Sequence, residues 1–106
     1  MKTETEPLYS RFAADPDMSE LANMFVEEMP TRIRCLKELL ASEDWQELGR
    51  FAHQLKGSAG GYGFDQLTPF AAKLEAAIRD GEAEAAIRAD VDELSDACGQ
   101  VRTVAP

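Results

Sequence analysis

The sequence is poor in the side chains that metal, disulfide and redox sites require. Its 106 residues include two cysteines and one histidine. Cys35 and Cys98 have neither metal-ligand spacing nor the density of a disulfide framework, so we expect small, reduced, buried side chains. A metal or haem site in a helical bundle needs more ligands than one histidine supplies. We therefore expect no bound metal or cofactor.

Positive charge and long apolar runs are also scarce. The chain carries 11 Lys and Arg against 20 Asp and Glu, a net charge of −9. Nucleic acids and anionic membranes are recognised by clustered cations, so we expect the protein to bind neither. No apolar run approaches the roughly 20 residues that span a bilayer, and residues 1–7 lack the apolar core of a signal peptide. These absences favour a cytoplasmic protein, and the Met1 start and polar ends favour a stand-alone chain.

What the sequence contains instead is helix periodicity, with no convincing strand pattern. Asp17 is expected to cap the first helix, with Glu20 in capping-box position, and Pro30 is expected to kink this helix without ending it. Apolar residues recur at steps of three and four in four segments. These segments are residues 17–41, from Ser42 or Glu43 to about 62, from Asp65 or Thr68 to Gly81, and from Glu82 to about Val101.

Four amphipathic helices joined by short turns predict an antiparallel up-down four-helix bundle. A short extra N-terminal helix over about residues 8–13 is compatible with the pattern. We expect the chain to form one domain over residues 1–106, with frayed ends at 1–7 and 103–106.

The one histidine, His53, has small and cationic neighbours on its own helix face. Glycine stands four residues before it and four after it, at Gly49 and Gly57. Residues four apart share a face of a helix, and a glycine in a helix interior costs about 1 kcal/mol relative to alanine. We interpret the two glycines as clearance for a large partner to reach the ring. Arg50 and Lys56, three residues to either side, share this face.

The charge around His53 differs from that of the whole chain. The 17 residues from Leu48 to Phe64 contain Arg50 and Lys56 and no acidic side chain. Such a patch favours an anion, and a phosphoryl group brings about −2 charge and three acceptor oxygens. A neutral imidazole offers one ring nitrogen as a nucleophile when the other donates to an acceptor. We expect Lys56 to reach the phosphoryl oxygens, whereas Arg50 is the weaker candidate, with Glu47 or Asp44 as alternative partners.

The segment Ala52–Gly63, followed by Leu67 and the pair Leu74–Glu75, closely resembles the signature of the histidine-containing phosphotransfer (HPt) domain. The resemblance covers about 24 residues, and the helix pattern extends it over most of the chain. It implies a four-helix bundle that carries phosphoryl groups in a multistep two-component phosphorelay. It also implies a phosphocarrier without kinase activity of its own, partnered by receiver domains of response regulators or hybrid sensor histidine kinases. Mg²⁺ is expected on the receiver.

Carried over residue by residue, the resemblance makes His53 the phosphoacceptor. Lys56 matches the lysine that steadies the phosphoryl oxygens, Gly57 matches the glycine that keeps the ring accessible, and Glu75 matches a position that accepts the second N–H of the histidine. Gln54 lies inside the motif as a further orienting candidate. Ser58 is expected to bond back to a helix carbonyl instead.

Docking of a receiver should use apolar side chains around the histidine face. The candidates are Phe12, Met18, Tyr62 and Phe64, each of which could equally belong to the core. The alternative function is a non-catalytic module that binds a receiver without turning over phosphate. We expect the protein to be a monomer.

Overall fold

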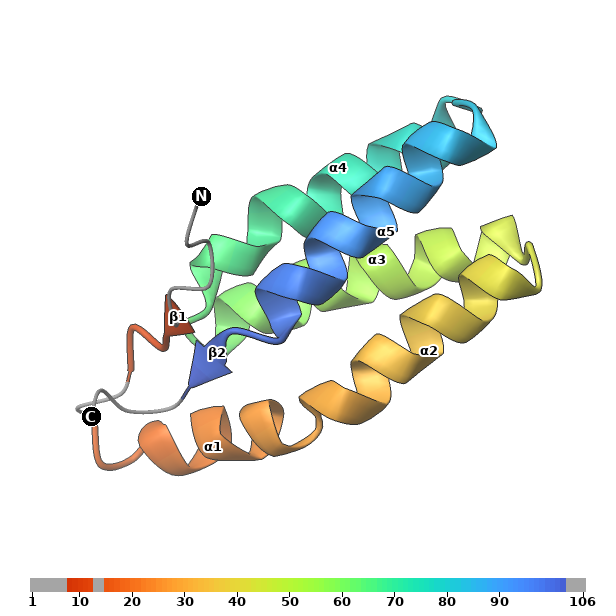
Figure 1. Ribbon diagram of the computed structural model, residues 1–106. Helices are drawn as coiled ribbons and strands as arrows, with labels where there is room; N and C mark the ends of the chain where they lie inside the picture. Colours follow the sequence, from red (N-terminus) through yellow and green to blue (C-terminus); the bar gives the residue numbers. More distant parts are fainter. Residues whose placement is uncertain (1–7, 13–14, 103–106) are drawn as a thin grey trace, which may run out of the picture.

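The computed structural model describes residues 8–12 and 15–102, so the ends predicted to be frayed, 1–7 and 103–106, lie outside the described residues. Helices α2 to α5 pack antiparallel around a common core, and α1 leaves α2 at an angle (Figure 1). This confirms the predicted four-helix bundle. The elements in chain order are β1 (Leu8–Tyr9), α1 (Ser19–Glu27), α2 (Met29–Ala41), α3 (Trp45–Gly61), the 3₁₀ turn η1 (Asp65–Leu67), α4 (Thr68–Arg79), α5 (Glu84–Cys98) and β2 (Val101–Arg102).

The predicted apolar stripes form the core. In α3 the stripe residues Leu48, Ala52, Leu55 and Ala59 are at most 3% exposed. Full burial of a leucine side chain stabilises the fold by about 1.5–3 kcal/mol, so this stripe fixes which way α3 faces. The stripe meets the buried side chains of the neighbouring helices. These include Leu36 and Leu40 of α2, Ala71, Leu74 and Ala77 of α4, and Ile87, Val91, Leu94 and Cys98 of α5.

The segment predicted as one kinked helix forms two. Helix α1 ends at Glu27, Glu28 is the junction, and α2 begins at Met29. Pro30 has no N–H to offer the preceding turn, and its ring clashes with the carbonyl four residues earlier, so a helix starts more easily at proline than it passes through. The single-helix prediction was therefore wrong, although the apolar stripe does continue through the junction.

Two helix starts differ from the sequence prediction, and a third settles an alternative that it left open. The Oδ1 atom of Asp15, not that of Asp17, accepts from the backbone N–H groups of Asp17 and Met18, at 2.9 and 3.3 Å. Helix α3 starts at Trp45, because Glu43 adopts a positive φ of 57° after α2 and Asp44 caps α3 by accepting from Glu47 N. Of the two starts considered for α4, Thr68 before Pro69 is correct, and Asp65 begins the preceding 3₁₀ turn.

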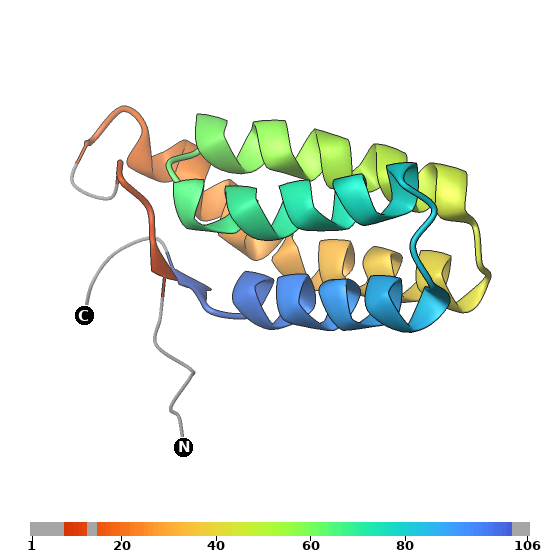
Figure 2. The same cartoon turned by 90° about the horizontal axis from the view of Figure 1, so that it is seen from above.

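The N-terminal segment is extended where a short helix was considered. Residues Leu8 and Tyr9 pair in parallel with Val101 and Arg102, which also shortens α5 to Cys98. Strands of two residues have no measurable periodicity, so they could not be predicted from the sequence. The pair lies at the end of the bundle where α3 ends and α4 begins, beside α1 (Figure 2).

Candidate functional site

Helix α3 presents His53 on the side opposite to its buried stripe. The His53 side chain is 65% exposed, whereas its neighbour in sequence, Ala52, is fully buried. Successive residues of a helix are rotated by about 100°, so burial of Ala52 and Leu55 leaves His53 at the surface. The exposed imidazole that the sequence predicted is therefore present.

A carboxylate from the next helix holds one nitrogen of the ring. His53 Nδ1 lies 2.8 Å from Glu75 Oε2, across the packed pair α3 and α4. The pKa of Glu75 lies below its ordinary value, chiefly because Lys56 donates a hydrogen bond to the carboxylate. Burial of the carboxylate opposes this shift, and the hydrogen bond from His53 adds to it. An ionised carboxylate only accepts, so Nδ1 is the ring nitrogen that donates to Glu75, and in the neutral ring this tautomer leaves the lone pair of Nε2 free.

The same carboxylate binds Lys56, one turn after the histidine. Lys56 Nζ lies 2.7 Å from Glu75 Oε1, and the lysine side chain is 34% exposed. Glu75 itself is 22% exposed and uses one oxygen for each partner. The arrangement fixes the ring, keeps a cation beside it and leaves room for the ammonium group to turn toward an incoming anion.

The two glycines that flank His53 have different surroundings. A Cβ atom added at Gly57 would meet no atom within 4 Å, so this side of the ring is open. A Cβ atom at Gly49 would lie 3.4 Å from Ile78 Cγ2 in α4. The small size of Gly49 therefore serves helix packing, and the access role predicted for both glycines fits the surroundings of Gly57 alone.

Arg50 and Ser58 form their polar contacts within α3 and not with the His53–Glu75–Lys56 cluster. Arg50 pairs with Glu47 at 3.4 Å, the alternative that the sequence left open. Ser58 Oγ donates to the backbone carbonyl of Gln54 at 2.9 Å, as predicted. The geometry thus brings His53, Lys56 and Glu75 together and gives no such contact to Arg50 or Gln54.

A family model of the Hpt domain matches residues 20–104. The chain belongs to the Hpt domain family. Members of this family are phosphocarriers in two-component signalling and interact with receiver domains. No curated protein and no solved structure gives a significant match to the sequence.

Three of the four predicted docking residues of this Hpt domain reach the surface in part. Phe12, Met18 and Tyr62 are half-buried, with the Arg11 guanidinium 4.6 Å above the Phe12 ring. Phe64 is fully buried, because its ring stacks on Phe25 of α1 at 5.4 Å. The assignment of Phe64 to docking was therefore wrong.

Sequence reasoning missed the two most exposed large apolar side chains of α1. Leu21 is 41% exposed and Met24 is 51% exposed. They stand three residues apart on one helix face, next to the core stripe of Ala22 and Phe25. The sequence did contain a signal for them: the apolar stripe of α1 is wider than the face with which a short helix contacts the core.

The described residues 8–12 and 15–102 contain no group of three His, Cys, Asp or Glu side chains placed to hold a metal ion. Cys98 is buried, which raises the pKa of its thiol to about 12, and Cys35 is half-buried. Within that same part of the chain, none of the helices is both long and apolar enough to span a bilayer. The candidate site brings together one imidazole, one carboxylate and one ammonium group.

Proposed function

We propose that this Hpt domain carries a phosphoryl group on His53 Nε2 between the aspartates of two receiver domains. The observation that carries the proposal is the 2.8 Å contact between His53 Nδ1 and the ionised Glu75 in a ring that is 65% exposed. It supports a tautomer of the exposed ring in which Nδ1 donates to Glu75 and Nε2 is the nucleophile.

The transfer step follows from this tautomer. The lone pair of Nε2 attacks the phosphorus of an aspartyl phosphate, a P–N bond forms, and the P–O bond breaks with its electrons going to the leaving carboxylate. The proton on Nδ1 stays hydrogen-bonded to Glu75 throughout. Passing the group on to a second receiver breaks the P–N bond and forms a P–O bond to the new aspartate, so the domain ends unchanged.

Lys56 is the cation placed to stabilise the transferred group. Its ammonium group, 2.7 Å from Glu75, lies one helical turn from His53 and can rotate toward phosphoryl oxygens that bring about −2 charge. Phosphoryl transfer depends mainly on positioning and charge stabilisation. A nucleophile and one cation therefore suffice on this side of the complex, with Mg²⁺ expected in the acidic site of the receiver.

Docking of the receiver is assigned to α1 and the end of α3. Phe25 of α1 stacks on Tyr62 at 5.1 Å, so the exposed Leu21 and Met24 lie near the end of the histidine helix. Tyr62 follows His53 by nine residues, about 14 Å along a helix. A standard interface of about 800 Å² per partner is wide enough to cover both the ring and this apolar patch.

Transfer of label tests the proposal. A receiver domain phosphorylated with ³²P is mixed with the parent chain, with His53→Gln and with Gln46→Ala, an exposed control on the same helix. The parent and the control should acquire acid-labile, base-stable label, and His53→Gln should acquire none. Equal labelling of His53→Gln would overturn the proposal. Saturable receiver binding without transfer in either direction would identify the non-catalytic module instead.

A further inference from the structure

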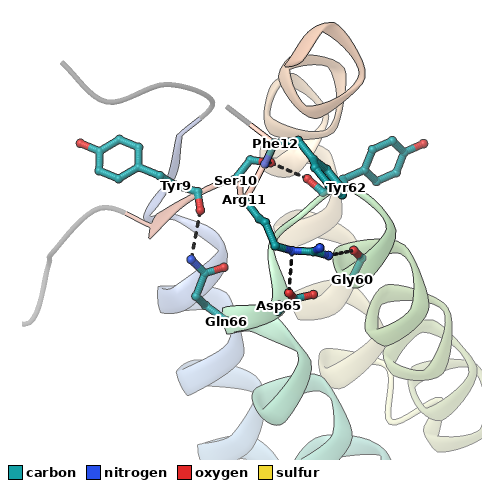
Figure 3. A network of polar contacts seen from close by, with 8 residues as sticks. All are labelled: Tyr9, Ser10, Arg11, Phe12, Gly60, Tyr62, Asp65 and Gln66. Atoms are coloured by element: carbon teal, nitrogen blue, oxygen red, sulfur yellow. Dashed lines mark hydrogen bonds and ion pairs between the residues drawn. The ribbon is translucent and has the colours of Figure 1, made fainter. Parts of the chain in front are cut away.

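Residues 8–12 form a strap that is fastened across the end of the bundle. Figure 3 shows this strap lying against the turn between α3 and α4. Arg11 N donates to Gly63 O at 2.7 Å, and Arg11 Nε pairs with Asp65 at 3.1 Å. Gln66 Nε2 donates to Tyr9 O at 3.0 Å. Arg11 and Tyr9 are thus tied to the turn, and Leu8 is tied to β2 by strand pairing with Val101.

Ser10 is the central fastening of the strap. Its side chain is buried, its Oγ donates to the carbonyl of Tyr62 at 2.7 Å, and the same Oγ accepts from Phe12 N at 3.0 Å (Figure 3). A buried hydroxyl that uses both its donor and its acceptor capacity holds two backbone segments in one register. Loss of this oxygen leaves one buried carbonyl and one amide without their partner.

Gly63 provides the space in which the strap lies. Its φ is +85°, a conformation that favours glycine, and a Cβ atom there would lie 2.5 Å from Ser10 Oγ and 2.9 Å from Arg11 N. No side chain fits at this position while the strap stays in place. The glycine found ten residues after His53 therefore has a physical reason that concerns the strap and not the ring.

Tyr62 connects the strap to α1. Its carbonyl binds Ser10, while its ring stacks on Phe25 of α1 at 5.1 Å. The strap is also tied to the start of α1 along the chain, because Asp15 N donates to Phe12 O and Asp15 Oδ1 accepts from Met18 N just before α1. The strap is therefore linked to the start of α1 through Asp15 and to Phe25 of α1 through Tyr62, and α1 carries the exposed Leu21 and Met24.

We propose that the strap is a positioning element for partner recognition: it holds α1 in the orientation that a receiver domain binds, and it takes no part in the chemistry at His53. This inference rests on the proposed function for the identity of the partner. Only molecules with α1 in place can bind, so the apparent affinity falls in proportion to the fraction that is competent. A strap released in nine molecules of ten lowers the affinity about tenfold.

Two variants release the strap in different ways, and a third serves as the control. Ser10→Ala removes the fastening and leaves the turn intact, whereas Gly63→Ala pushes the strap away. Ser42→Ala removes a serine hydroxyl that donates to Leu39 O at the opposite end of the bundle. Circular dichroism establishes that each variant is folded, and Ser10→Ala keeps the test open if Gly63→Ala does not fold.

Two readouts separate recognition from chemistry. Binding is measured by calorimetry against the receiver domain, chosen from those encoded in the source genome, that the parent chain binds most tightly. Chemistry is measured with phosphoramidate, a small donor that needs no docking surface: Nε2 attacks the phosphorus, the donor's P–N bond breaks and ammonia leaves. We expect Ser10→Ala and Gly63→Ala to bind the receiver about tenfold more weakly than the parent chain. Phosphoramidate should label both variants at the same rate as the parent. Ser42→Ala should match the parent in both.

Unchanged receiver affinity in folded Ser10→Ala would overturn the strap proposal, and so would an equal loss of affinity and of phosphoramidate labelling. A parent chain that binds the receiver but is not labelled at His53 would instead overturn the proposed function. In that case the affinities of the strap variants still decide whether the strap positions α1.

Discussion

The two turns of α3 that flank His53 have similar compositions and opposite surroundings. The preceding turn carries Gly49 and Arg50, and the following turn carries Lys56 and Gly57. Arg50 pairs with Glu47 on its own helix and Gly49 faces Ile78, whereas Lys56 shares Glu75 with His53 and Gly57 faces open space. The glycine and the cation are placed symmetrically about His53 along the chain. The preceding pair contributes to helix packing, whereas the following pair belongs to the candidate site.

The difference shows that spacing along a helix establishes which residues share a face but not what the face meets. Helix α4 contacts the turn before His53 through Ile78, which lies against Gly49. One turn earlier on α4, Glu75 contacts His53 itself. The open side of the ring begins at Gly57, where the neighbouring helix leaves room. Substitutions at matched positions on the two sides of His53 should therefore have different effects.

The largest expected effect is on the open side. Gly57→Leu should lower the rate of transfer from a phosphorylated receiver by more than about a hundredfold, because the new side chain occupies the approach to the ring. The free energy of unfolding should change little, or rise by up to about 1 kcal/mol, since leucine favours a helix more than glycine does. Single-turnover transfer and urea unfolding measure the two quantities. Transfer that survives this substitution would show that access does not pass over Gly57.

The next effect concerns the two cations. Lys56→Ala should slow transfer by about tenfold to a hundredfold, equivalent to roughly 1.4–3 kcal/mol of transition-state stabilisation. Arg50→Ala, the matched change on the other side, should alter the rate by less than about twofold, because an exposed pair such as Arg50–Glu47 contributes little. Initial rates at equal receiver concentration compare the two variants. Equal losses would mean that both cations act on the phosphoryl group.

A smaller effect, on stability, is expected on the packed side. Gly49→Leu adds side-chain atoms beyond a Cβ that already lies 3.4 Å from Ile78 Cγ2. Overpacking costs about 1–3 kcal/mol and helix propensity returns about 1 kcal/mol, so we expect a net loss of up to about 2 kcal/mol. Urea unfolding gives this value, and the transfer rate of the folded variant should stay close to that of the parent. A blocked transfer without loss of stability would restore an access role for Gly49.

The smallest effect is a pH dependence of stability that comes from Glu75 of α4, the partner of His53 and Lys56. Glu75 has a lowered pKa in the fold, so its contribution to stability is complete above the unfolded value of about 4.3 and is lost as the pH falls through the folded value. The stability difference between the parent and Glu75→Gln should be constant near neutral pH and should shrink below about pH 4. Urea unfolding at pH 7 and pH 3.5 measures it. A difference that grows in acid would contradict the direction of the shift.

Much of the fold could be predicted because burial repeats with the helix. The stripe of Leu48, Ala52, Leu55 and Ala59 indicated both α3 and the face on which His53 stands. Helix junctions were harder, because Pro30 is compatible with a kink and with a new helix start, and only the packing of α1 decides. The strap could not be predicted, since strands of two residues and a hydroxyl such as that of Ser10 leave no periodic pattern.

The candidate site divides in the same way. His53 and Lys56 stand three residues apart and could be paired from sequence, but Glu75 lies 22 residues from the histidine and was placed only through the family resemblance. Phe64 was a docking candidate because it follows the histidine helix, and stacking on Phe25 decides for the alternative, a place in the core. Leu21 and Met24 were overlooked because an apolar residue on a short helix looks the same whether it meets the core or a partner.

The parallel pair of Leu8 with Val101 brings the first and last described parts of the chain to one point. Neighbouring strands lie about 4.8 Å apart, so a second domain fused ahead of the bundle and one fused behind it would leave from nearly the same place. The local concentration of a tethered receiver around His53 would then depend on the length of the tether and very little on which end carries it. Fusions of either order should consequently be interchangeable in their reach.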